Sequence, residues 1–288
     1  MMESERNMET KVMVNVTLTS LQQKLLDMLK WFDEYCEQHQ ICYYVAGGTL
    51  LGAVRHGGFI PWDDDIDIII PRSDYEKLIR TFDSQGSLYE LESPYSGSKD
   101  FLFSFTKLYD STTTLTENTK PQCTRGIYID LFPLDGVGDE NWKSNYAKFD
   151  RLNMILMART CSVRKGRGFL KNLSVLLMRM IPNFILNNKK LSIKVDKAAS
   201  RIDYKSSVYV GNFMGAYRAK EIIKKEIIGK PTRYKFENIY VNGPEKYDEY
   251  LTHIYGDWRQ IPPEDKRHGS HSYLYVDLEH SYKNKRDE

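Results

Sequence analysis

The sequence predicts an α+β protein, in which helices cover a mixed β-sheet and a mainly helical, basic segment is added to this core. The chain of 288 residues is long enough for one large domain or for a domain with an appended lobe. Residues 20–82 indicate the order helix, strand, glycine turn, helix, strand, helix. Residues 151–205 then carry thirteen Lys or Arg against two Asp, on an apolar background typical of helices.

The N-terminal elements follow from apolar spacing and from capping residues. Ser20 with Gln23 has the pattern of a capping box, and apolar residues then recur at helical spacing from Leu21 to Cys36. Residues 41–46 are mostly apolar and predict a strand, and residues 63–70 predict a second one. The core therefore begins with an amphipathic helix that is followed by two strands.

Composition and charge exclude several classes of protein. Lys plus Arg (41) nearly balances Asp plus Glu (39), so we expect no nucleic-acid partner. The four cysteines lie too far apart for a paired zinc pattern, and we interpret them as reduced thiols in a reducing compartment. The N-terminus lacks the apolar core of a signal peptide, and no window holds about 20 apolar residues. We therefore expect a cytoplasmic protein.

Asp65 and Asp67 lie two positions apart in the strand predicted over 63–70. Side chains alternate between the two faces of a strand, so both carboxylates share one face while Ile66 and Ile68 point into the core. Two carboxylates about 7 Å apart repel each other unless a cation lies between them. Mg²⁺, with Mn²⁺ as the alternative, is a hard cation that prefers such oxygen ligands. A solvated acidic loop, the other interpretation, would not need the interleaved β-branched residues.

Asp130 is a third carboxylate in an apolar setting. It lies in the strand predicted over 126–132, among Ile, Tyr, Leu and Phe. Burying a carboxylate alone is costly. A metal ion shared with Asp65 and Asp67 explains all three acids.

The turn Gly47-Gly48-Thr49 lies between the first strand and a short helix that we expect to begin at Thr49. Glycines allow a ligand to approach the backbone closely, and a helix N-terminus offers free N–H groups and the positive end of its dipole. We interpret Gly47, Gly48 and Thr49 as phosphate-binding residues. A common turn without a ligand is the alternative.

These motifs together resemble a known family. Gly47-Gly48, then Asp65-Ile-Asp67, then Asp130 follow the pattern of polymerase-β-like nucleotidyltransferases. The stretches AGGTLLGAVRHGGFIPWDDDIDI, FTKLYDSTTT, GIYIDLFPLD and YGDWRQIPPEDKRHGSH are similar to the LicD family of bacterial phosphotransferases, which also resembles the fukutin-related proteins. The resemblance extends over residues 20–275 and implies a nucleotidyltransferase-type mixed sheet at the core.

LicD-like proteins are associated with the transfer of phosphocholine, or a similar phospho-alcohol, from a CDP-linked donor to a hydroxyl of a cell-surface glycan. The resemblance implies that Asp65, Asp67 and Asp130 are catalytic residues and metal ligands, with proton acceptance by Asp130 as an alternative. It also implies two partners, a CDP-linked small-molecule donor and a glycan acceptor that is lipid-linked or a teichoic-acid-type precursor.

Five basic residues are further candidates for binding the donor. A guanidinium at Arg55 could hold a diphosphate with two hydrogen bonds, and His56 follows it, although a surface Arg beside a capping His is the alternative. Lys107 lies in the strand predicted over 101–108, where a lysine is seldom buried without a partner. Arg267 and His268 lie in the last matching motif.

The composition changes behind the loop 135–141, which we interpret as a boundary. This divides the chain into a flexible N-terminus, a catalytic core, a basic helical segment, and a C-terminal mixed α/β part that completes the cleft. Their bounds are 1–18, 19–140, 141–205 and 206–288.

Residues 164–190 combine apolar residues with Lys and Arg. Such a segment can bind an anionic membrane surface, here the inner face of the cell membrane near a lipid-linked acceptor. The alternative is a set of helices packed on the core with a solvated basic face.

Two other functions compete with phospho-alcohol transfer. A DxD glycosyltransferase also holds a metal against a nucleotide diphosphate, but it needs neither the Gly47-Gly48 turn nor a third acid in this arrangement. A pseudoenzyme that binds nucleotide or glycan is the other alternative, and the presence of all three acids argues against it.

Overall fold

The structure is a computed structural model that describes residues 12–13, 16–98, 101–119, 121–160, 168–269, 271 and 273–286. Its helices are α1 (Leu18–Gln38), α2 (Gly47–His56), α3 (Arg72–Thr81), α4 (Trp142–Thr160), α5 (Phe169–Met180), α6 (Asn188–Ala199), α7 (Lys225–Ile228) and α8 (Tyr247–Tyr255), with the 3₁₀ turns η1 (Arg218–Glu221), η2 (Glu264–Lys266) and η3 (Tyr282–Arg286). Its strands are β1 (Val12–Met13), β2 (Tyr44–Val45), β3 (Asp67–Pro71), β4 (Tyr89–Glu92), β5 (Thr106–Asp110), β6 (Thr114–Glu117), β7 (Cys123–Arg125), β8 (Tyr128–Gly138), β9 (Tyr209–Gly211), β10 (Ile222–Lys224), β11 (Thr232–Phe236), β12 (Ile239–Gly243) and β13 (Tyr273–Asp277).

The central sheet is mixed. Its strands follow the order β10-β9-β8-β3-β2, and β5, which also pairs with β4, joins the N-terminal half of β8. β3 and β8 are parallel, whereas β2, β5 and β9 are antiparallel to their neighbours. The predicted α+β fold with a mixed sheet is therefore confirmed.

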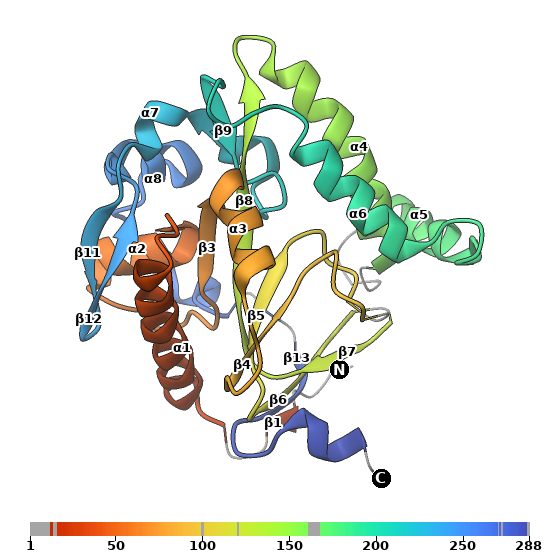
Figure 1. The fold of residues 1–288 in the computed structure, drawn as a ribbon, viewed down its shortest axis with the longest axis horizontal. Helices are drawn as coiled ribbons and strands as arrows, with labels where there is room; N and C mark the ends of the chain where they lie inside the picture. Colours follow the sequence, from red (N-terminus) through yellow and green to blue (C-terminus); the bar gives the residue numbers. More distant parts are fainter. Residues whose placement is uncertain are drawn as a thin grey trace, which may run out of the picture.

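Two smaller sheets flank this core (Figure 1). One has the strand order β1-β13-β6-β7 and joins a strand from each end of the chain, while β11 and β12 form a hairpin beside α2. Strand β1 lies within the segment 1–18 that the sequence predicted to be flexible, and residues 1–11 and 14–15 lie outside the described residues.

Helix α1 is confirmed, but its N-cap differs from the predicted one. Thr17 is the N-cap residue, and its hydroxyl accepts a hydrogen bond from the N–H of Ser20, whose own side chain accepts from the N–H of Thr17. Ser20 therefore closes the capping box from inside the helix and does not begin it. The residues from Leu21 to Cys36 that were predicted to share one face are buried against the sheet.

Strand β8 continues to Gly138, so the loop predicted over 135–141 is wrong over its first four residues, while the domain boundary placed there stays a prediction. Strand β5 pairs with β8 as far as Leu131, and β9 pairs from Asp135 onward. Pro133 lies between these two partners, and its missing N–H therefore interrupts neither antiparallel ladder. The long strand carries the chain directly from the central sheet towards α4.

Helices α4 and α6 enclose a second hydrophobic cluster with β9 and the end of β8, and α5 packs on α4. In Figure 1 these three helices extend from one side of the sheet. Residues 161–167 lie outside the described residues, and a separate basic lobe over 141–205 stays a prediction. None of the helices in the described ranges is both long enough and apolar enough to cross a membrane.

Candidate active site

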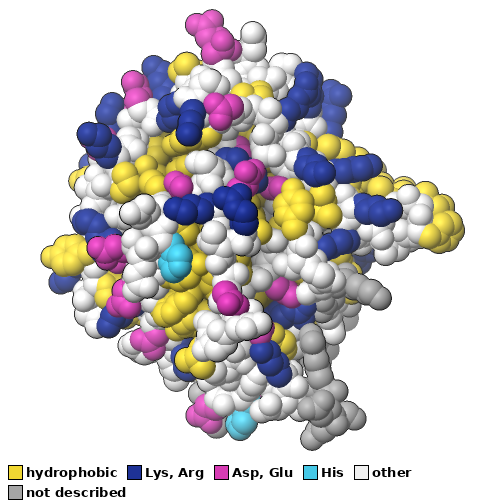
Figure 2. All heavy atoms as spheres, in the orientation of Figure 1, with side chains coloured by type: hydrophobic (Ala, Val, Ile, Leu, Met, Phe, Trp, Pro, Cys, Tyr) yellow, Lys and Arg dark blue, Asp and Glu magenta, His cyan; other side chains and the backbone are white. Residues whose placement is uncertain are grey.

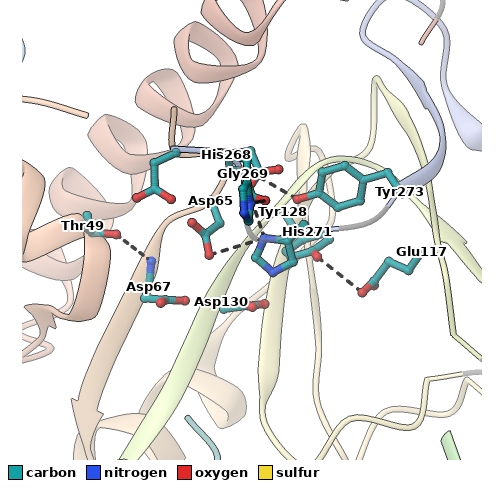
Figure 3. Close-up of polar contacts among 12 residues, drawn as sticks. Thr49, Asp65, Asp67, Glu117, Tyr128, Asp130, His268, Gly269, His271 and Tyr273 are labelled. Atoms are coloured by element: carbon teal, nitrogen blue, oxygen red, sulfur yellow. Dashed lines mark hydrogen bonds and ion pairs between the residues drawn. The ribbon is translucent and has the colours of Figure 1, made fainter. Parts of the chain in front are cut away.

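Two of the predicted acids lie side by side on neighbouring strands. The parallel register of β3 and β8 pairs Asp67 with Asp130. Strands are about 5 Å apart, and residues paired in register point to the same face. The Asp67 N–H donates to Thr49 Oγ1 at 2.9 Å, and the Asp130 N–H donates to the Ile66 carbonyl at 3.0 Å. Both backbones are thus fixed, and Figure 3 shows the two carboxylates facing one space.

The glycine turn packs against these acids. Helix α2 begins at Gly47, two residues before the predicted start at Thr49. Gly47 has a φ of +52°, and a Cβ there would lie 3.3 Å from Asp67 Oδ2. A Cβ at Gly48 would lie 2.8 Å from Asp63 Oδ2, so a side chain at Gly48 would displace that carboxylate. The turn allows the acids to approach the positive end of the α2 dipole.

The acids line a cavity of about 720 Å³. The predicted site residues that line it are Gly47, Gly48, Arg55, Asp65, Asp67 and Asp130. The predicted site residues outside its lining are Thr49, His56, Lys107, Arg267 and His268. Other lining residues come from the C-terminal third of the chain and include Tyr217, Glu221, Tyr255 and His271.

The cavity concentrates negative charge. Burial raises the pKa of Asp67 well above its usual range, and the nearby Asp65 and Asp130 raise it further. Burial and then Asp65 raise the pKa of Asp63 to about 8. Burial also raises the pKa of Asp130, although Lys107 opposes this effect. Several carboxylates in one poorly solvated space favour protonation or a bound cation, so the charge distribution fits a metal ion.

Lys107 lies beneath the acids and not in the cavity wall. Its side chain is 2% exposed, and its Nζ lies 3.3 Å from Asp130 Oδ1 and 3.2 Å from Glu117 Oε2. The same ammonium group lies 3.3 Å from the centre of the Tyr128 ring. Lys107 thus balances part of the charge of Asp130, and its predicted contact with the donor stays a prediction.

His271 completes a group that can hold a metal ion. One ligand atom from each of Asp64, Asp65 and His271 lies within 4.8 Å of the others. His271 Nδ1 is 3.3 Å from Asp64 Oδ1 and 3.5 Å from Asp65 Oδ2. Burial lowers the pKa of His271, but the carboxylates outweigh burial and the net direction is upward. This group shares only Asp65 with the predicted set Asp65, Asp67 and Asp130, whose role as metal ligands stays a prediction.

Arg55 connects α2 to the segment behind α8. Its Nη1 donates to the Trp258 carbonyl at 2.8 Å, and its Nε donates to His56 Nε2 at 3.0 Å. Burial lowers the pKa of Arg55. The guanidinium therefore lines the cavity, and some of its N–H groups already donate hydrogen bonds within the protein.

Arg267 and His268 lie at the rim. The guanidinium of Arg267 lies 5.5 Å from the centre of the Trp62 ring, and its Nε donates to the Pro262 carbonyl at 2.8 Å. The exposed His268 contacts the carbonyl of Gly269 through its Nδ1, whereas His271 points towards the acids (Figure 3). Donor binding by Arg267 and His268 stays a prediction.

Sequence reasoning did not select Asp63, Asp64, Glu221 or His271 as site residues. The two aspartates precede the chosen pair in one acidic run, and His271 ends the motif that contains His268, so signals for these three were present. Glu221 has no motif around it. Its place in the cavity depends on how η1 packs against α8.

The mixed sheet has carboxylates on adjacent strands, faced by a glycine turn at a helix N-terminus, which is the arrangement expected of a nucleotidyltransferase-type domain. The family model described as LicD/FKTN/FKRP, nucleotidyltransferase domain, matches residues 40–158. This part of the chain belongs to that family, as the sequence motifs implied.

Curated relatives agree with this assignment. The chain is 28% identical over 265 residues to the lipopolysaccharide cholinephosphotransferase LicD of Haemophilus influenzae, covering 90% of this chain and 97% of the relative. It is 37% identical over 75 residues to an uncharacterized protein of Rickettsia prowazekii, which is 25% of this chain and 28% of that protein. It is 62% identical over 26 residues to the human ribitol 5-phosphate transferase FKRP, 9% of this chain and 5% of that protein. The matched domain is that of a LicD-family transferase, as predicted.

Proposed function

We propose that this protein transfers a phospho-alcohol group from a CDP-linked donor to a hydroxyl of a cell-surface glycan or teichoic-acid-type precursor. Phosphocholine is the group that we favour. The observation that carries the proposal is the in-register pair Asp67 and Asp130 in a cavity closed by the Gly47-Gly48 turn. The similarity to a lipopolysaccharide cholinephosphotransferase over 90% of the chain supports the choice of phospho-alcohol.

Asp65, Asp67 and Asp130 would hold Mg²⁺ or Mn²⁺, and Asp64 with His271 offers further ligand atoms beside Asp65. Carboxylate oxygens are the ligands that these hard cations prefer. A bound divalent cation would neutralise charge on the transferring and leaving oxygens.

The other residues position the donor and exclude water. The N–H groups at the start of α2 are oriented for phosphate oxygens, and Gly47 lets a phosphate approach the backbone. Arg55 on the cavity wall offers a cation to the diphosphate. Lys107 holds Asp130 in place from below, through its ion pair. Positioning and charge neutralisation together supply most of the catalysis in phosphoryl transfer.

A product assay tests the proposal. Purified protein is incubated with Mg²⁺, a glycan acceptor and CDP-choline, CDP-ethanolamine, CDP-glycerol, CDP-ribitol or UDP-sugars, and the released nucleotide is identified. We expect CMP from CDP-choline. Nucleotide release from UDP-sugars alone would contradict the proposal and indicate a glycosyltransferase, and binding without any product would indicate a pseudoenzyme.

The matched variants are Asp65→Ala and Glu140→Ala, the second at an exposed acid outside the cavity. CDP-choline with Mg²⁺ is expected to raise the melting temperature of the wild type and of Glu140→Ala. It is expected to leave that of Asp65→Ala unchanged. A full shift in Asp65→Ala would refute the proposed site.

We further propose that α5 binds the anionic inner face of the membrane, where a lipid-linked acceptor would lie. Phe169, Leu173, Leu177 and Met180 recur at helical spacing, yet this apolar face is turned to solvent, with Phe169 79% and Met180 77% exposed. Phe184 beyond the helix is 88% exposed. Figure 2 shows hydrophobic side chains over this projecting end with Lys and Arg beside them, a combination typical of membrane-surface helices.

Liposome co-sedimentation tests this surface. We expect the wild type to bind vesicles containing anionic phosphatidylglycerol and not vesicles of phosphatidylcholine alone, with loss of binding in Leu177→Glu. Leu88→Glu is the matched control, because Leu88 is 62% exposed in another part of the chain. The absence of wild-type binding at low salt would refute the membrane proposal without affecting the proposed reaction.

A further inference from the structure

Two tyrosine rings form an aromatic corner in the cavity wall. Tyr217 precedes η1 and Tyr255 ends α8, and their ring centres lie 5.2 Å apart with planes at 83°. Both rings line the cavity. Among the side chains that the structure describes, no Lys or Arg lies over either ring. Aromatic faces attract cations, and perpendicular rings offer two walls of the kind that enclose quaternary ammonium groups.

A buried carboxylate lies beside this corner. Glu221 is 9% exposed and lines the same cavity, and the Tyr217 N–H donates to its Oε1 at 2.9 Å. A Cβ at Gly215 would lie 2.0 Å from Oε1, so the glycine allows the backbone to close around the carboxylate. The neighbouring Arg218 turns away and donates to Asp150 Oδ1 at 2.6 Å.

Glu221 has no cationic side chain within ion-pair distance among the described residues. A buried carboxylate without a cation is costly, even where backbone N–H groups reduce the cost. A cationic ligand in the cavity would supply the missing charge. Tyr217 and Glu221 thus offer an aromatic face and a negative charge to one ligand group.

The corner adjoins the acids of the proposed site. A Cβ built at Gly47 would lie 3.3 Å from Asp67 Oδ2 and 3.7 Å from the Tyr255 hydroxyl. The Asp67 carboxylate and the Tyr255 hydroxyl therefore both lie beside Gly47. A phosphate bound at the Gly47 turn can place a group at the end of a two-carbon arm in this corner.

We propose that Tyr217, Tyr255 and Glu221 form the binding subsite for the positively charged alcohol group of the donor, so that the enzyme selects a quaternary ammonium alcohol over a neutral polyol. This subsite rests on the proposed phospho-alcohol transfer. It assigns donor specificity to η1 and the end of α8, whereas the acids on β3 and β8 would hold the metal ion that neutralises the reacting phosphate.

Two donors of the same shape test the subsite. CDP-choline carries a trimethylammonium group, and CDP-3,3-dimethylbutanol carries a neutral tert-butyl group in its place. We measure kcat/KM for both donors in the wild type and the variants. We expect the wild type to prefer CDP-choline by about tenfold or more, since cation–π contact and a carboxylate each favour the charged group.

Glu221→Gln keeps the size of the side chain and removes its charge. We expect its preference for CDP-choline over the neutral donor, measured as the ratio of the two kcat/KM values, to fall about tenfold. Glu226→Gln is the matched control, because Glu226 is an exposed acid outside the cavity. We expect the preference of Glu226→Gln to equal that of the wild type.

Tyr217→Leu and Tyr217→Phe separate the ring from the hydroxyl. Tyr217 is 45% exposed, so both variants are expected to fold. The Leu variant should lose preference for CDP-choline, and the Phe variant should keep it. Circular dichroism and melting temperature check the fold of each protein.

The outcomes separate the subsite from the reaction. Turnover of CDP-choline with equal losses for both donors in Glu221→Gln would overturn the subsite and leave the reaction in place. A raised Mg²⁺ requirement in Glu221→Gln with unchanged donor preference would also overturn it, since Glu221 would then serve a metal. Wild-type turnover of neither donor would refute the proposed function itself.

Discussion

Strand β8 carries two buried aspartates five residues apart, Asp130 and Asp135, and their surroundings differ. An odd separation places them on opposite faces of the sheet. Asp130 faces the cavity with Asp67, whereas Asp135 faces α3 and α6. The same residue type on one strand thus serves two environments.

Around Asp135 the charge is held by short, directed bonds. Arg72 donates to both oxygens of Asp135, at 2.6 and 2.7 Å, and its Nη1 donates to Asp196 Oδ1 at 2.9 Å. The Tyr95 hydroxyl donates to the other oxygen of Asp196 at 2.7 Å. Arg72 therefore connects β8 to α6. The charges of Asp135 and Asp196 are already paired with a cation of the chain, so no bound cation is needed there.

Around Asp130 the charge is not balanced in this way. One ammonium group, Lys107, is shared between Asp130 and Glu117 at 3.2 to 3.3 Å. The charged neighbours that raise the pKa of Asp67 are all carboxylates. The comparison shows that burial of an acid does not by itself indicate a binding site. A binding site is indicated by buried acids whose charge is not fully neutralised by cations of the chain.

The largest effect on stability is expected when the ion pairs of Asp135 are removed. Arg72→Ala leaves Asp135 and Asp196 buried without their cation, and we expect a loss of about 3–5 kcal/mol in the free energy of unfolding. Arg218→Ala removes an exposed pair with Asp150 and should cost about 1 kcal/mol or less. Urea denaturation measures both, and equal losses would contradict the contrast.

Neutralising an acid in the group around Asp67 and Asp130 should instead affect activity. We expect Asp67→Asn to lower kcat by about 10²- to 10³-fold, with no loss of stability because repulsion among the carboxylates falls. Asp135→Asn, the same change in the other region, should lower stability and leave more of the activity. A destabilised Asp67→Asn protein with normal turnover would reverse the comparison.

Adding Mg²⁺ should raise the free energy of unfolding, and this gain should depend on the carboxylates around Asp67 and Asp130. At Mg²⁺ concentrations about 100 times the dissociation constant, we expect about 2.7 kcal/mol of added stability in the wild type. EDTA should remove this gain, and Asp67→Asn should show little of it. A thermal shift that persists in Asp67→Asn would place the ion elsewhere.

The smallest effect is a pH dependence of donor choice. Burial raises the pKa of Glu221 to about 7, so the group is charged above this pH and neutral below it. Tyr217 and Tyr250 face Glu221, and burial raises the pKa of both, so neither ionises in this range. We expect the preference for CDP-choline over its neutral analogue to fall about tenfold between pH 8 and pH 6. The ratio of kcat/KM values measures it, and Glu221→Gln should show no such change.

Asp65 precedes β3, which begins at Asp67, so the predicted placing of Asp65 and Asp67 on one strand face is wrong. The sequence by itself determined the α+β class, helix α1, the Gly47-Gly48 turn and the strand that carries Asp67. These features depend on local periodicity and on motifs within short stretches of chain. Local pattern also identified Lys107 as unusual, because a lysine in an apolar strand needs a partner. The N-cap of α1 and the end of β8 were placed wrongly, since hydrogen bonds with neighbouring residues and strands decide them.

The tertiary structure alone decided which groups meet. The register of β3 against β8 brings Asp67 to Asp130, and the C-terminal strand region brings His271 to Asp64. Packing of η1 against α8 places Glu221 at the cavity. These contacts join residues from 63 to 207 positions apart, and no local pattern encodes such distances. Charge balance around each buried acid is therefore a property of the fold and not of the motif.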